Sequence, residues 1–101
     1  MEEKRIPGFE DYSITSEGTV YSYKWGRRIE KAQILNHGHV VVFFTKNGYP
    51  YQRSVALLVA RAFIPKPEIS RMVRHKDGDK WNNSADNLEW IICEDRVLGY
   101  I

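Results

Sequence analysis

The fold is decided by the stretch Val73-Arg74-His75-Lys76-Asp77-Gly78-Asp79-Lys80-Trp81-Asn82-Asn83-Ser84-Ala85-Asp86-Asn87-Leu88-Glu89-Trp90. A polar loop at residues 76–87, rich in Asp and Asn, separates two runs that are typical of strands, Arg71–His75 and Leu88–Ile92. A helix of about two turns is predicted at Glu94–Tyr100. The C-terminal part of the chain is therefore predicted to be a ββα unit.

Upstream of this unit, short β-rich runs alternate with turn signals. Strands are predicted at Tyr12–Thr15, Thr19–Lys24, Ala32–Leu35, His39–Thr45 and Tyr49–Arg53. The last two flank Lys46-Asn47-Gly48, and Asn-Gly between β-rich runs is a strong hairpin signal. Residues 40–44 are apolar at every position, which predicts a central strand covered on both faces.

One helix is expected between these strands and the ββα unit. Ser54 is a suitable N-cap for a helix at Val55–Phe63, and Pro65 and Pro67 would end it. The predicted fold class is α+β, with small antiparallel sheets, one middle helix and the C-terminal ββα unit. The 101 residues suffice for one small domain, with a β module at 1–53 followed by the helix and the core at 54–101.

Composition and charge narrow the possible functions. Hydrophobic residues make up 43% of the chain, which indicates a globular domain rather than a disordered one. Residues 20–76 hold eleven Lys and Arg against two Glu, whereas both ends of the chain are acidic. A basic middle suits a polyanion such as nucleic acid, although a surface with intermixed charges is the alternative.

Membrane and secreted classes are not expected. The longest apolar runs, Val40–Phe44 and Val55–Ala60, are too short to span a bilayer. No apolar segment follows the charged N-terminus, so we expect no signal peptide. The single cysteine, Cys93, excludes an internal disulfide. These features predict a cytoplasmic protein.

Three linked motifs resemble one family. The series His75, Asp77-Gly78, Asn82-Asn83 and Asn87-Leu88-Glu89-Trp90 closely resembles the HNH nucleases of phage introns and free-standing phage homing genes. The segment Ile6-Pro7-Gly8-Phe9-Glu10 is similar to the small module that often precedes this core, and residues 58–65 are similar to its connecting helix. The resemblance covers nearly the whole chain and implies a phage or mobile-element protein in the host bacterial cytoplasm.

The resemblance also implies a specific site. The family's core holds one divalent cation, usually Mg²⁺, with a histidine as general base for water and an asparagine that orients it. His75 matches the base and Asn87 the orienting residue. The two metal-ligand positions, just before the base and on the closing helix, correspond to Arg74 and Arg96. A shift of one or two residues in the helix would offer Glu94 or Asp95 in place of Arg96, whereas position 74 is fixed next to His75. Both ligand positions therefore carry a fixed positive charge, and no bound metal is expected.

The size of the repulsion supports this expectation. A guanidinium about 5 Å from a divalent cation, at an effective dielectric constant near 20, is repelled by roughly 6–7 kcal/mol. Arginine binds phosphate well, so the site could hold DNA without cutting it. The predicted binding residues are Arg74, Arg96, Lys76, Lys80, Trp81, Arg27, Arg28 and Lys31. Two roles remain open for Trp81, contact with a partner and cover for the core.

Two function classes follow. The first is a catalytically inactive protein derived from an HNH homing endonuclease. It would bind DNA or a host complex that handles nucleic acid, for example as an inhibitor of CRISPR or restriction defence. The alternative is an active Mg²⁺-dependent nicking endonuclease, which the retained His75 and Asn87 favour. A zinc site formed by His37, His39 and His75 is a further alternative to a simple polar turn. The partner and the oligomeric state are left open.

Overall fold

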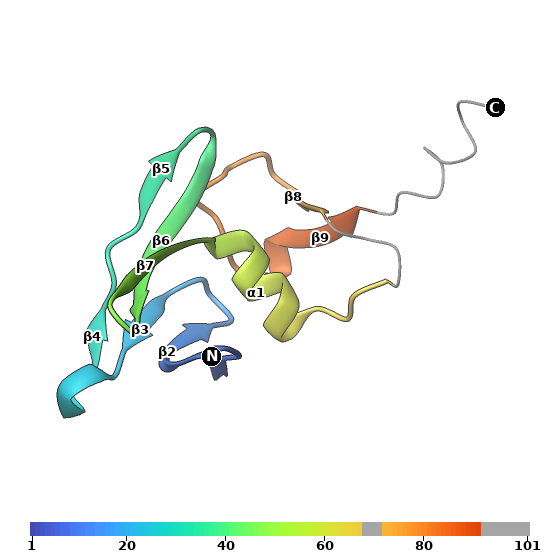
Figure 1. Cartoon of the computed structure of the whole chain (residues 1–101). Coiled ribbons are helices and arrows are strands. Elements are labelled where there is room, and N and C mark those ends of the chain that lie inside the picture. Colours follow the sequence, from blue (N-terminus) through green and yellow to red (C-terminus); the bar gives the residue numbers. More distant parts are fainter. Residues whose placement is uncertain (68–71, 92–101) are drawn as a thin grey trace.

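Three small antiparallel sheets pack around one α-helix in the computed structural model, which describes residues 1–67 and 72–91 (Figure 1). The first sheet consists of β1 (Glu3–Ile6), β2 (Phe9–Thr15), β3 (Val20–Ser22) and β4 (Ile29–Glu30), in that order. The second consists of β5 (Ile34–Asn36), β6 (His39–Lys46) and β7 (Tyr49–Ser54), and the third of β8 (Met72–His75) and β9 (Leu88–Ile91). The predicted α+β class is confirmed.

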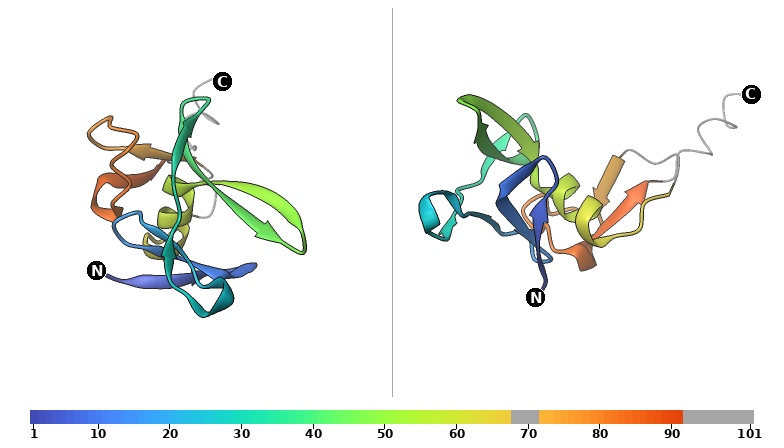
Figure 2. Two further views of the ribbon diagram at one scale, coloured as in Figure 1. Left: turned by 90° about the vertical axis from the view of Figure 1, so that its left-hand side faces the viewer. Right: turned by 60° about the horizontal axis from the view of Figure 1, so that its bottom comes forward.

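The helix α1 (Val55–Phe63) begins and ends as predicted. The Ser54 Oγ accepts a hydrogen bond from the Leu57 N–H at 3.3 Å, which satisfies one of the donors left free at the helix start. Val55, Leu58 and Val59 are buried against strands of all three sheets, so α1 is the common support of the molecule (Figure 2). In the described part of the chain, no helix has the length and apolar character needed to cross a membrane.

The core is formed where the sheets meet α1. Tyr12 of β2 stacks on Phe44 of β6 with ring centroids 4.3 Å apart, which joins the first two sheets. Trp90 of β9 is 8% exposed, and its Nε1–H donates to the Ile64 carbonyl at 3.1 Å. The ββ unit is therefore attached to the end of α1 by both apolar and polar contacts.

Some predicted boundaries were wrong. β6 is the central strand of its sheet as predicted, but Phe43 is 43% exposed because the β6–β7 hairpin extends beyond the core. The strand predicted to reach Lys24 ends at Ser22, where the short helix η1 (Lys24–Gly26) begins. β1 was not predicted. The predicted helix at 94–100 and the predicted strand ends Arg71 and Ile92 lie outside the described residues.

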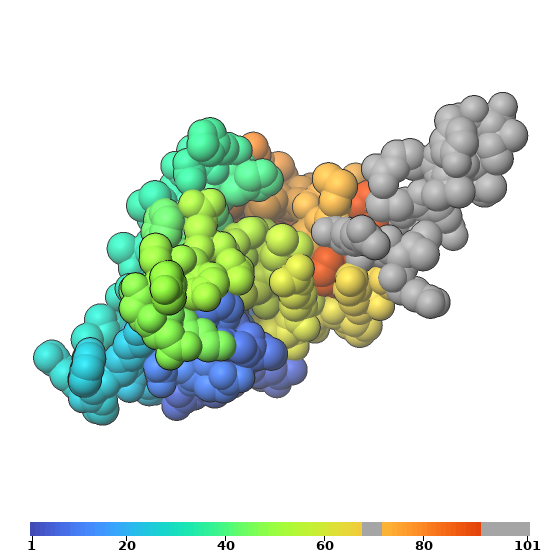
Figure 3. Space-filling view, viewed as in Figure 1, coloured from blue at the N-terminus to red at the C-terminus, as the bar shows by residue number. Residues whose placement is uncertain are grey.

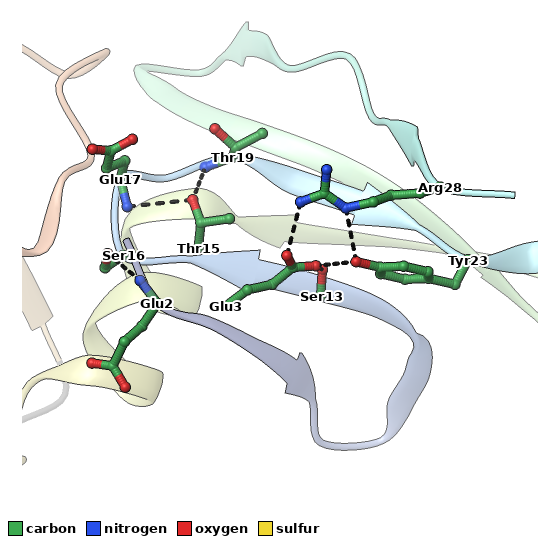
Figure 4. Close-up of polar contacts among 9 residues, drawn as sticks. All are labelled: Glu2, Glu3, Ser13, Thr15, Ser16, Glu17, Thr19, Tyr23 and Arg28. Carbon is green, nitrogen blue, oxygen red and sulfur yellow. Dashed lines mark hydrogen bonds and ion pairs between the residues drawn. The ribbon is translucent and has the colours of Figure 1, made fainter.

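A polar cluster ties β1 to β2 and to the segment around η1 (Figure 4). The Glu3 carboxylate accepts hydrogen bonds from Ser13 at 2.5 Å, from the Tyr23 hydroxyl and from the Arg28 guanidinium at 2.8 Å. Arg28 also stacks on Tyr21, with its Cζ 3.6 Å from the ring centroid. Arg28, which was predicted to contact phosphate, is thus engaged in contacts that stabilise the fold. The sequence could not show its pairing with Glu3, because the two residues lie 25 positions apart.

The same contacts make the stability of the fold depend on pH. The hydrogen bonds from Ser13 and Tyr23, with the charge of Arg28, lower the pKa of Glu3 to about 2. Because this pKa lies below the ordinary value of 4.5, the stabilisation is present above pH 4.5 and is lost as the pH falls toward 2.

Replacement of Glu3 by glutamine should therefore destabilise the protein at neutral pH only. Glu3→Gln keeps the size of the side chain and removes its charge, and solvent screening limits the expected loss to about 1 kcal/mol. Urea unfolding at neutral and at acidic pH measures the difference between the two proteins. A difference that is equally large at both pH values would show that the carboxylate charge is not its source.

Candidate functional site

His75 is the last residue of β8, and its ring is held from the loop that follows. The side chain is half-buried, and its Nε2 lies 2.6 Å from the Oδ1 of Asn83. The backbone reverses directly after it through Asp77-Gly78, where the Gly78 N–H donates to the His75 carbonyl at 3.1 Å. The loop thus folds back and brings Asn83 against the imidazole.

The tautomer of His75 follows from the second bond of Asn83. This asparagine is 3% exposed, and its Nδ2 donates to the Lys80 carbonyl at 3.1 Å. The amide oxygen must therefore be the atom that faces His75, so the imidazole donates its Nε2–H. The other ring nitrogen, Nδ1, then carries the free lone pair that a general base requires.

Asn87, which was predicted to orient the histidine, has a different set of partners. Its Nδ2 donates to Asp77 Oδ1 and to the Asn82 carbonyl, each at 2.9 Å, and its Oδ1 accepts from the Asp77 N–H at 3.2 Å. Asn82 also donates to Asp77, and these bonds lower the pKa of the Asp77 carboxyl. Asn87 closes the loop in this structure, and Asn83 contacts the imidazole.

The N-terminal sheet supports this loop directly. The Ala85 N–H donates to the Ser16 carbonyl at 2.7 Å across the two segments. Gly18 has a φ of 92°, and a Cβ there would lie 3.0 Å from the Asn83 carbonyl oxygen. Only glycine fits both the backbone angle and the close approach, so the turn between β2 and β3 fixes the position of Asn83.

Arg74 lies beside His75 and pairs with a carboxylate of the neighbouring strand. Strand register places it opposite Glu89, and its Nε forms an ion pair with the Glu89 carboxylate. A guanidinium offers only donors and cannot bind a metal ion, and the nearby carboxylate is already paired. At position 74 this chain therefore presents a guanidinium, paired with Glu89, and not an oxygen ligand.

Other candidate ligands do not provide a substitute within the described ranges 1–67 and 72–91. Across these ranges, no group of three or more His, Cys, Asp or Glu side chains could hold a metal ion. The zinc alternative with His37, His39 and His75 therefore fails. Arg96, the second predicted ligand position, lies outside the described residues.

A groove opens beside His75, between the ββ unit and the start of β6. Its volume is about 290 Å³, and it is lined by Arg74, His75, Lys80 and Asn83 on one side and by His39, Ser54 and Ala56 on the other. No carboxylate is among the described residues that line it. The turn between β5 and β6 reaches the loop, and a Cβ at Gly38 would be 3.1 Å from the Lys80 Nζ (Figure 3). The groove thus presents cations and imidazoles to an anionic partner.

The other predicted binding residues are divided between two regions. Lys76 and Trp81 lie on the loop near the groove, and Trp81 is 54% exposed, so it does not cover the core. Arg27 and Lys31 lie at the first sheet and are not brought to His75. The sequence did not identify Asn83 as the partner of His75 or His39 as a residue of the groove. It also gave no sign that the Trp25 side chain would be 91% exposed.

The tautomer of His75 provides a direct test of this geometry. Nitrogen NMR of labelled protein, at alkaline pH where imidazoles are neutral, should show a protonated Nε2 at His75. Asn83→Ala removes the acceptor and should give a mixture of both tautomers. Asn87→Ala is the matched control, and it should leave the tautomer unchanged. If Asn87→Ala changed the tautomer and Asn83→Ala did not, Asn87 would be the residue that orients the ring.

The relatives found by comparison with known proteins are all described as endonucleases. No family model matches the chain. The chain is 39% identical over 92 residues to the DNA endonuclease I-HmuI of Bacillus phage SP01, covering 90% of this chain and 52% of that protein. It is 32% identical over 97 residues to the H-N-H endonuclease F-TflII of Escherichia phage T5, covering 94% of this chain and 50% of the relative. An uncharacterised HNH endonuclease of Acanthamoeba polyphaga mimivirus is 36% identical over 87 residues, which are 86% of this chain and 26% of that protein.

The fold leads to the same family. The structure matches a solved structure described as DNA binding and cleavage by the HNH homing endonuclease I-HmuI, with a TM-score of 0.81 and 33% identity. The match covers 98% of this chain and 57% of that one. The chain thus spans about half the length of the phage relatives that it matches. Sequence and fold thus agree, over nearly all the residues of this chain, that it is related to the HNH homing endonucleases of phages.

Proposed function

We propose that this chain is a phage or mobile-element protein that binds double-stranded DNA at the groove beside His75 and does not cleave it. It acts in the cytoplasm of the bacterial host. The phage origin of two relatives and the description of I-HmuI as a protein that binds and cleaves DNA support the target. The absence of cleavage distinguishes this proposal from what the relatives' names describe.

The observation that carries the proposal is the ion pair between Arg74 and Glu89. Where the family resemblance implies an oxygen ligand, this chain has a guanidinium, which forms an ion pair with Glu89. The side chain of Arg74 is 66% exposed, so it can contact a phosphate that enters the groove. A phosphate at this place would accept hydrogen bonds from the exposed guanidinium, whereas the guanidinium supplies no oxygen ligand to a divalent cation.

The charges around the groove support the same partner. Lys80 lines the groove with Arg74, and Lys76 follows His75 directly on the exposed part of the loop. Phosphate contacts of this kind dominate the affinity of proteins for DNA and make it depend on salt. The imidazole of His75, with its free Nδ1, would lie next to the bound backbone.

Trp81 supports a second partner class. An exposed indole on a polar loop is typical of residues that dominate protein–protein binding. A host protein or nucleoprotein complex, such as a CRISPR or restriction defence system, would use this residue together with the basic surface. DNA remains the first choice because the groove itself presents only cationic and neutral side chains.

The competing function is Mg²⁺-dependent nicking of DNA. The observation that favours it is the bond between His75 Nε2 and Asn83, which leaves Nδ1 ready to accept a proton. General-base action contributes about 10²–10⁴-fold to a reaction rate, but it does not stabilise the charge of the leaving oxygen. The imidazole alone is therefore insufficient for efficient cleavage.

DNA binding should be weak and strongly dependent on salt. If about five phosphates are neutralised, the plot of log K against log salt has a slope near −4 to −5. Fluorescence anisotropy with a labelled duplex, from low to physiological salt, measures this slope. Arg74→Gln and Lys80→Gln should each reduce its magnitude by about 1. Absence of binding at the lowest salt would exclude DNA and leave a protein partner.

Metal-dependent cutting should be absent in the wild type and appear when oxygen ligands are supplied. Purified protein should not nick supercoiled plasmid with Mg²⁺ or Mn²⁺. The double variant Arg74→Asp with Arg96→Asn should gain nicking, and adding His75→Ala should remove it, because the base is then lost. The choice of position 96 comes from the family resemblance. Robust nicking by the wild type that is lost in His75→Ala would establish the nuclease instead.

A further inference from the structure

Trp25 is the most exposed large apolar side chain in the described part of the chain, and its backbone is strained. The indole is 91% exposed, and the residue has a φ of 64° and a ψ of 24°, which is the left-handed region. It occupies η1, between β3 and β4, in the cyan turn that projects from the lower left of Figure 1. Within the described residues, its ring takes part in no hydrogen bond, ring stacking or cation–π contact.

Two other pairs in the described part of the chain have positive φ at both residues, and they allow a comparison with Trp25-Gly26. At Asn47-Gly48 the φ angles are 54° and 79°, and at Trp25-Gly26 they are 64° and 71°. Such turns favour Asn or Gly at their first central position, because a large side chain is strained there. His37-Gly38, with 51° and 81°, is the third. Trp25 therefore strains the backbone, and in the described part of the chain no hydrogen bond or ring contact of its indole compensates for this strain.

The turn is nevertheless held firmly in place. The Lys24 Nζ donates to the Thr45 carbonyl at 2.8 Å and to its Oγ1 at 2.5 Å, which ties the turn to β6. The Tyr23 N–H donates to the Asp11 carbonyl at 2.7 Å, and the Arg27 N–H donates to the Lys24 carbonyl at 3.4 Å. The protein thus presents the indole on a fixed support, which reduces the entropy lost when a partner binds it.

The charge next to the indole favours nucleic acid as the partner. Arg27 and Arg28 follow the turn and are exposed, and Lys31 lies just beyond. Arg28 is engaged with Glu3 but keeps a side-chain exposure of 49%. The acidic residues near the turn are Glu3, Asp11 and Glu30, against Lys24, Arg27, Arg28 and Lys31. Arg28 is paired with Glu3, so Arg27 is the exposed cation next to the indole that is left for a phosphate. A flat aromatic ring bordered by cations suits base or sugar surface flanked by phosphates.

We propose that the turn at residues 24–27 is a second DNA contact, in which the Trp25 indole packs on base or sugar surface and Arg27 binds a phosphate. The proposal rests on the DNA binding proposed above. In Figures 1 and 2 this turn lies at the end of the molecule away from β8 and β9. It therefore extends the contact with DNA to a part of the chain that is separate from the groove of His75.

Trp25→Asn tests the proposal, because it recreates the Asn-Gly turn that the chain already uses at residues 47–48. The variant should melt at the same temperature as the wild type or higher, since the strain is relieved. Its affinity for a duplex that is long enough to reach both sites should fall roughly 5-fold or more, as expected when about 1 kcal/mol of apolar contact with base edges or sugars is lost. Trp25→Phe should keep most of the affinity.

Salt dependence separates the two roles in the turn. Trp25→Asn should lower the affinity at every salt concentration without changing the log–log slope, whereas Arg27→Gln should reduce the magnitude of the slope by about 1. Wild-type affinity in Trp25→Asn would overturn the proposal, and so would a lower melting temperature, which would make Trp25 structural. If the wild type itself does not bind DNA at low salt, the proposed function has failed, and this result is distinct from failure of the Trp25 contact alone.

Discussion

The site depends on the contact between the turn after β2 and the loop that precedes β9. The Ser16 carbonyl accepts the Ala85 N–H, and the absence of a side chain at Gly18 leaves room for the Asn83 backbone. Asn83 in turn holds the imidazole of His75. The first sheet is therefore more than an appended module, because it completes the support of the ring from a distance of nearly sixty residues in sequence.

The orientation of the His75 ring and the charge beside it are set by different parts of the structure. The ring of His75 is oriented by the loop, through Asn83 and the Asp77 network that Asn87 closes. The charge beside it is set by the register of β8 and β9, which places Arg74 opposite Glu89. Because these two controls are independent, the orientation of the His75 ring does not depend on which residue stands at position 74, where this chain has a guanidinium.

The sequence was informative where local chemistry decides the structure. The cap at Ser54, the hairpin at Asn47-Gly48 and the strands around the polar loop follow from short patterns, and the structure confirms them. The choice between Asn83 and Asn87 could not be predicted, since both lie in one loop and only its closure decides which amide meets the ring. The pairing of Arg28 with Glu3 and the exposure of Trp25 depend on contacts between distant segments, which local patterns do not show.

The pair formed by Arg74 and Glu89 also determines what the ββ unit needs in order to stay folded. If position 74 carried a carboxylate, it would face Glu89 directly across the two strands, and like charges in such a pair destabilise a sheet. A cation would then have to bind before the sheet reached its full stability, so folding would be linked to the supply of metal in the cell. With arginine at this position the two opposite charges form an ion pair across the strands, and no cation is needed to offset the charge of Glu89.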